Sequence, residues 1–120
     1  MLKTLKADFP LKARTVHLIL SKKPEEALKR LSEYYNVEVP KVKIGMPKGH
    51  VKSRGCYVAG KKTIYFSHRD ALYNPYVVLH EFYHHLRTID RKHKGTEKLA
   101  DAFAKGFMEA YKELAGLNHK

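Results

Sequence analysis

The sequence has a single cysteine and no long apolar run, and each shortage excludes a class of protein. The lone cysteine, Cys56, cannot form an intrachain disulfide, and its strand-like surroundings predict a buried structural thiol. No apolar run approaches the about 20 residues that a membrane helix needs, since the longest is Thr15–Leu20. The stretch from Met1 to Pro10 has spaced lysines and does not resemble a signal peptide. We therefore expect a cytoplasmic protein with no membrane span.

Acidic residues are also scarce: 12 Asp and Glu stand against 24 Lys and Arg, which gives a net charge of +12. Such an excess indicates polyanionic partners, among them nucleic acid, acidic protein or a membrane surface. The lysines run from Lys3 to Lys120 and are not gathered in one tail. A diffusely basic surface and a dedicated nucleic-acid face are therefore both compatible with the sequence.

What is present suits one small globular domain. The chain has 120 residues, of which 43% are hydrophobic and 30% charged. A chain of this length can bury a core without disulfides. We expect a single domain over residues 1–120, in which residues 1–13 are compatible with an extended arm and residues 116–120 with a flexible tail.

The first half of the chain predicts a helix followed by short strands. Pro24 begins a helix whose apolar residues recur at helical spacing up to Asn36. Val37–Ile44 partly alternates, and its proline makes it an edge or interrupted strand. Gly55–Phe66 indicates two strands joined around a glycine. Thr15–Leu20 is compatible with either a strand or the end of a helix.

Two helices are predicted in the second half. Asn74 is a helix cap and Pro75 a first-turn proline, and together they open a helix that continues through a histidine-rich run. A last helix spans roughly Thr96 to Leu114 and is closed by Gly116. The fold class is therefore α+β: a sheet of about three strands packed with an N-terminal helix, a histidine-bearing helix and a C-terminal helix that carries a glutamate.

The histidine-rich run, His80-Glu-Phe-Tyr-His84, matches the pattern H-E-x-x-H. Residues four apart share a helix face, so His80 and His84 can bind one Zn²⁺ ion. Zinc lowers the pKa of a bound water toward about 7, and Glu81 is placed to take its proton as general base. This arrangement predicts a zinc metallopeptidase, a hydrolase that cleaves peptide bonds in peptides or unfolded proteins.

A catalytic zinc site needs a third protein ligand. Glu97 is the favoured candidate, and Asp101, four residues later on the same helix face, can hydrogen-bond the outer nitrogen of a ligand histidine. Asp90, ten residues after His80, is the alternative, in the place where the metzincin peptidases carry their third ligand. An unbroken helix to Arg91 would end about 10 Å beyond the second histidine, which argues that it ends sooner or that the last helix begins before Glu97.

HEFYH followed by ExxxD resembles the gluzincin metallopeptidases, and the small size is most similar to the archaeal minigluzincins, over roughly residues 24–115. The resemblance implies a glutamate, here Glu97, as third ligand on a downstream helix. It also implies that the strand near Thr63–Phe66 is the sheet edge that pairs with an extended substrate. Tyr111, predicted on the Glu97 face by helical periodicity, is a candidate donor to the oxyanion and also a candidate core residue.

Two other functions fit the same sequence. A basic nucleic-acid-associated protein could carry a structural or vestigial metal site, although no recognition motif of the usual modules is present. A protease that cleaves one dedicated regulatory protein would share the same motif, because the motif does not specify the substrate.

Overall fold

The computed structural model describes residues 8–49, 53–90 and 96–116, except for the side chain of Asp90. The elements follow the chain in this order: α2 (Phe9–Leu20), α3 (Pro24–Tyr35), β1 (Lys41–Ile44), β2 (Gly55–Val58), the 3₁₀ turn η1 (Ala59–Lys61), β3 (Thr63–Phe66), α4 (Arg69–Leu72), α5 (Pro75–Asp90) and α6 (Glu97–Leu114). The predicted α+β class and the three strands are confirmed.

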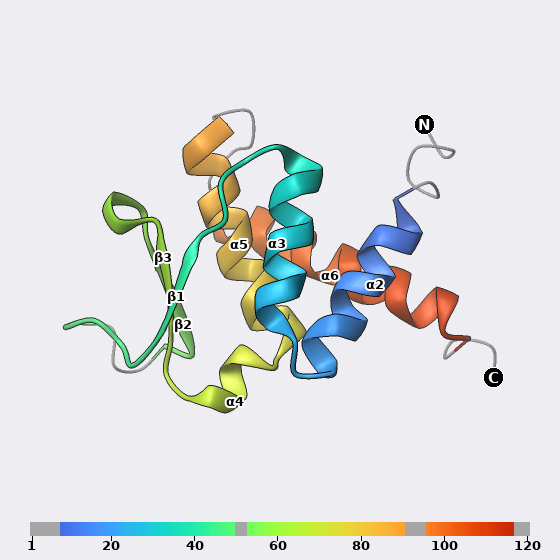
Figure 1. Ribbon diagram of the computed structural model, residues 1–120, viewed down its shortest axis with the longest axis horizontal. Coiled ribbons are helices and arrows are strands. Elements are labelled where there is room, and N and C mark those ends of the chain that lie inside the picture. Colours follow the sequence, from blue (N-terminus) through green and yellow to red (C-terminus); the bar gives the residue numbers. More distant parts are fainter. Residues whose placement is uncertain (1–7, 50–52, 91–95, 117–120) are drawn as a thin grey trace.

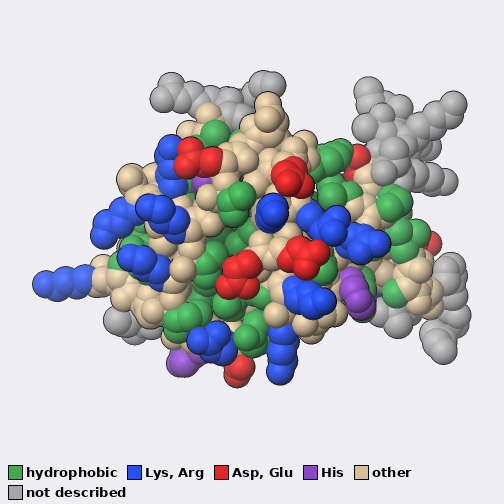
Figure 2. Space-filling view, in the orientation of Figure 1, with side chains coloured by type: hydrophobic (Ala, Val, Ile, Leu, Met, Phe, Trp, Pro, Cys, Tyr) green, Lys and Arg blue, Asp and Glu red, His purple; other side chains and the backbone are tan. Residues whose placement is uncertain are grey.

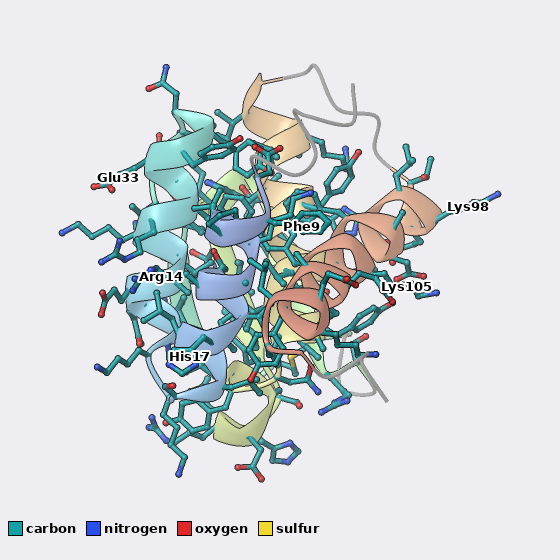
Figure 3. The ribbon with its side chains drawn as sticks, turned by 90° about the vertical axis from the view of Figure 1, so that its right-hand side faces the viewer. Phe9, Arg14, His17, Glu33, Lys98 and Lys105 are labelled. Carbon is teal, nitrogen blue, oxygen red and sulfur yellow. The ribbon has the colours of Figure 1, made fainter. Side chains whose placement is uncertain are left out.

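The N-terminal region differs from its prediction. Residues 9–13 are the first turns of α2 and not an extended arm, while residues 1–7 lie outside the described part of the chain. Thr15–Leu20 is the end of this helix, although β-branched residues are frequent in it. Val16 and Ile19, three residues apart, are fully buried on one face, so tertiary packing outweighs the modest helix propensity of such residues. Figure 3 shows α2 between α3 and α6.

The next helix, α3, follows the prediction. It begins at Pro24, has Glu25 and Glu26 in its first turn, and ends where Asn36 takes the left-handed conformation with φ 59°. Asparagine tolerates this conformation better than most residues, which makes it a suitable helix end. The buried face of α3, which includes Leu28 and Leu31, joins the main hydrophobic core.

The sheet has the strand order β1-β3-β2, with β1 parallel and β2 antiparallel to β3. The Thr63–Phe66 strand, β3, is therefore central and buried along its whole length, so the expectation that it is the edge for substrate pairing is wrong. The edges are β1, which follows Pro40, and β2, which packs against α5.

Helix α5 lies between the sheet and the other helices (Figure 1). It packs on β2 on one side and on α6 on the other. The core around it includes Leu79, Phe82 and Leu86 of α5, all fully buried, together with Phe66 of β3 and Phe107 of α6. Because α5 is held on both sides, it is a rigid support for the polar residues that it carries.

Helix α5 runs to Asp90, only one residue before Arg91, and α6 does not begin before Glu97, so the expected geometric conflict does not arise. The end of α5 lies about 9 Å beyond His84 along the axis, and the few residues up to Glu97 can span about 20 Å when extended. The connection is therefore long enough to return Glu97 to the histidines. Within the described ranges, no helix combines the length and apolar character needed to cross a membrane.

Candidate metal centre

The two histidines of the HEFYH run face the same side of α5. Their ring centroids are 5.1 Å apart, as expected for residues one helical turn apart. The side chains of His80 and His84 are 14% and 12% exposed, so both are mostly shielded but remain accessible at one edge. The helix that positions both histidines begins directly after Asn74, whose side chain accepts a hydrogen bond from the backbone N–H of Tyr76 at 2.9 Å.

Glu97 joins the two histidines from α6. Its Oε1 is 2.8 Å from Nε2 of His80, and its Oε2 is 3.0 Å from Nε2 of His84. One donor atom from each residue lies within 4.8 Å of the others, so the three side chains form a group that could hold a metal ion. Thr96 caps α6 by accepting a hydrogen bond from the backbone N–H of Leu99 at 3.0 Å, which fixes the first turn that carries Glu97.

Behind His80, Asp101 and Tyr76 form a second polar contact. Oδ1 of Asp101 lies 2.9 Å from Nδ1 of His80, and the same oxygen accepts a hydrogen bond from the hydroxyl of Tyr76. The buried Nδ1 makes no hydrogen bond of good geometry, although its distance from the carboxylate of Asp101 suits one. The hydrogen bond from Tyr76 is the largest cause of the lowered pKa of Asp101, which keeps that side chain a carboxylate that can accept from Nδ1.

His84 has a different neighbour on its outer nitrogen. Nε of Arg87 donates a hydrogen bond to Nδ1 of His84 at 3.3 Å. Because a guanidinium has no acceptor, Nδ1 must be the unprotonated nitrogen, and Nε2 carries the hydrogen that points to Glu97. Holding a metal through Nε2 requires this hydrogen to move to Nδ1, where it would face Arg87. Burial, the largest cause, lowers the pKa of His84 and thus favours the neutral ring.

Glu81 lies beside this group, on the side of α5 that faces β2. Its side chain is buried against Gly55, where an added Cβ would be 3.1 Å from Cγ of Glu81 and 2.9 Å from Cγ1 of Val77. Burial, aided by the nearby carboxylate of Glu97, raises the pKa of Glu81 to about 7, although His80 and a backbone hydrogen bond from Tyr57 oppose the shift. A carboxyl group with this pKa can bind and release a proton near neutral pH.

A cleft of about 460 Å³ opens beside Glu81 and the metal-binding group. One wall is β2 and the other is α5, and the residues that line it are Ser53, Gly55, Cys56, Tyr57, Ala59, Glu81, His84, Arg87, Thr88 and Glu97. Cys56 is half-buried on this wall, so the expectation of a buried structural thiol is wrong. The β2 wall is anchored to α5 by a hydrogen bond from the hydroxyl of Tyr57 to Nδ1 of His85 at 2.8 Å, and His85 is fully buried.

The structure thus brings together the predicted residues His80, Glu81, His84, Glu97 and Asp101. Tyr111 is not among them. It lies 14 residues after Glu97 on α6, about 21 Å along the axis, and lines a separate groove with Pro10 and His17 of α2. The proposed role of Tyr111 at an oxyanion is therefore wrong. The side chain of Asp90, the alternative third ligand, lies outside the described residues.

Three residues of the site were not predicted. Tyr76 lies four residues before His80 and Arg87 three after His84, so helical spacing could have placed both on the same face of α5. Gly55 carries no comparable signal, because its close approach to Glu81 depends on how β2 packs against the helix. We compared the chain with known proteins, and no family model, curated protein or solved structure matches it.

Proposed function

We propose that this chain is a zinc-dependent peptidase of the gluzincin type, similar in plan to the minigluzincins. The observation that carries the proposal is the position of Glu97, which places one carboxylate oxygen against Nε2 of each histidine. A chance histidine-rich helix would have no reason to meet a carboxylate from another helix in this way. Glu81, buried beside the group and facing a cleft, is the second part of the argument.

The donor set fits zinc. Two imidazole nitrogens and a carboxylate are the ligands of many catalytic zinc sites, in which adjacent donor atoms are about 3.4 Å apart. Each histidine nitrogen lies 2.8 or 3.0 Å from one of the two oxygens of Glu97, and one donor atom from each residue lies within 4.8 Å of the others, which is the range that a shared ion requires. Among the described residues the group has three members, which is the number that leaves one coordination position for water or substrate.

A zinc ion held by these ligands would supply a Lewis acid that makes water nucleophilic at neutral pH. The protein residues handle the protons. Glu81 takes one proton from the attacking water at its carboxylate and gives it to the departing amine nitrogen as the carbon–nitrogen bond breaks. Asp101 orients the ring of His80 through Nδ1, and Tyr76 holds Asp101 in place.

Strand β2 supports a peptide as the substrate. It is an edge strand along one wall of the cleft, and in the part of the chain that the structure describes no strand other than β3 pairs with it. An extended peptide could pair with this free side by backbone hydrogen bonds, which would place a peptide bond close to Glu81. Gly55 at the start of β2 allows the strand to approach Glu81 closely.

The test combines metal analysis with proteolysis. We expect one zinc per chain after reconstitution, lost on His80→Ala, and cleavage of an unfolded protein by the zinc-loaded wild type. Glu81→Gln should keep zinc and the fold but lose cleavage, because it removes proton transfer without removing a ligand. Glu109→Gln, at an exposed position of α6, is the control and should retain activity. Absence of zinc binding, or full activity of Glu81→Gln, would reject the proposal.

A further inference from the structure

The positive charge of the chain is concentrated in the part that forms the sheet. Residues 39–69 contain eight Lys or Arg and no Asp or Glu, whereas residues 70–116 contain seven of each sign. All three strands lie within residues 39–69, so most of the excess charge lies at the sheet end of the molecule. Figure 2 shows the basic side chains over this end, at the left. A one-signed surface of this kind attracts anions before they make contact.

A hollow of about 440 Å³ lies within this basic end. It is lined by Glu38, Val39, Lys41, Lys43, Gly60, Lys61, Lys62 and Thr63. One carboxylate already binds here, since Oε1 of Glu38 is 2.9 Å from Nζ of Lys62. The other three lysines are exposed. Glu38 belongs to the wall of the hollow and occupies Lys62, so Lys41, Lys43 and Lys61 are the ammonium groups with which carboxylates of another chain could pair.

The hollow begins where the cleft of the metal centre ends. Ala59, the first residue of η1, lines the cleft, and the next two residues, Gly60 and Lys61, line the hollow. An extended chain paired along the free side of β2 would pass η1, and so Lys61, directly beyond Val58. Lys41 and Lys43 lie on the opposite edge strand, about 14 Å across the sheet, so the chain would reach them by turning across this end of the sheet. A peptide bound beside Glu81 would thus bring its next segment first to Lys61 and, after a turn, to the lysines of β1.

We propose that this protein acts on acidic polypeptide segments, whose carboxylates are bound by the lysine hollow while the peptide bond to be cleaved lies in the cleft. This inference rests on the proposed peptidase function and adds a substrate class to it. Lysines on an exposed edge strand also protect against strand-to-strand aggregation, which is sufficient reason for Lys41 and Lys43. This protection does not account for Lys61, which lies outside the edge strand β1 but lines the same hollow, whereas Lys62 is paired with Glu38.

The experiment uses peptides that share a neutral centre and carry on both sides a run of glutamates, glutamines or lysines. Cleavage is measured with zinc-loaded wild type, and binding with zinc-loaded Glu81→Gln. Exposed lysine–carboxylate pairs are individually weak, so two or three of them should favour the glutamate peptide over the glutamine peptide by about tenfold in both assays. The preference should fall as salt is added.

Two double variants with the same change in net charge distinguish an effect of the hollow from an effect of the total charge. Lys43→Glu with Lys61→Glu should abolish or reverse the preference, whereas Lys29→Glu with Lys112→Glu, at exposed positions of α3 and α6, should preserve it. Equal cleavage of all three peptides, or equal effects of the two pairs, would overturn the inference and leave the peptidase function standing. Cleavage of none of the peptides would instead reject the peptidase function. If the variant with Lys43→Glu and Lys61→Glu loses binding of single-stranded DNA but keeps the peptide preference, the hollow binds nucleic acid and the inference is overturned.

Discussion

Replacing Glu81 by Gln should make the chelator-treated protein more stable than wild type near pH 8 but not near pH 4. The reason is the raised pKa of this carboxyl group, about 7 in the folded protein against an ordinary value of 4.5. Below pH 4.5 both the folded and the unfolded wild type hold the proton. Between the two pKa values the unfolded chain releases it while the folded chain retains it, so the free energy of unfolding falls as the pH rises.

The magnitude follows from the size of the shift. Each pH unit between the two pKa values corresponds to about 1.4 kcal/mol, so wild type loses up to about 3 kcal/mol between pH 4.5 and pH 7. The glutamine side chain has no proton to lose and should be free of this decline. For a chain of this length the difference near pH 8 corresponds to about 10 °C in Tm.

Urea unfolding followed by circular dichroism, at several pH values in the presence of a chelator, would measure the difference between the two proteins. Other titrating groups contribute to both curves and largely cancel in the difference. Glu109→Gln, at an exposed position, should follow the wild-type curve at every pH. A stability difference for Glu81→Gln that does not change with pH, or a variant less stable than wild type near pH 8, would refute the reasoning.

Three further changes test the surroundings of the metal centre. Asp101→Asn should weaken zinc binding by about 10- to 100-fold in a chelator competition, and unchanged affinity would remove Asp101 from its supporting role. Arg87→Gln should tighten zinc binding severalfold in the same assay. In the metal-bound form the hydrogen on Nδ1 of His84 faces a donor in wild type, whereas the amide oxygen of glutamine can accept it. Weaker zinc binding by the variant would contradict this tautomer argument. Gly55→Ala should lower the free energy of unfolding in urea by about 1 to 3 kcal/mol, since the added Cβ would lie 2.9 Å from Val77. Gly60→Ala, whose Cβ would have no atom within 4 Å, should change stability little. Equal effects of the two substitutions would contradict the close packing of β2 on α5.

The part of the site that depends on local spacing could be predicted from the sequence. His80 and His84 share a face because they lie on one helix, and Asn74 marks where that helix begins. Glu97 and Asp101 share a face of α6 for the same reason. Helical phase specifies the side of a helix and not the height along it, which is why Tyr111 was placed wrongly in the site.

Features that depend on contacts between distant segments could not be predicted. The alternation in Gly55–Phe66 indicates strands but does not say which of them is central, and the order β1-β3-β2 is set by how Lys41–Ile44 returns to pair with β3. Burial of Val16, Leu18 and Ile19 in the core likewise decided between helix and strand for Thr15–Leu20. The lysine hollow forms because β1 and η1 meet across the sheet, although they are separated along the chain.

The division of the candidate metal ligands between two helices has a consequence for the lifetime of the protein. The histidines belong to α5 and the carboxylate to α6, so an ion bound by all three would tie these helices to each other. Helix α6 also packs along α2, and its departure would expose the core on both sides. Zinc at 100 times its Kd would add about 2.7 kcal/mol to the free energy of unfolding. The supply of metal would then govern how fast the chain is degraded as well as whether it can act.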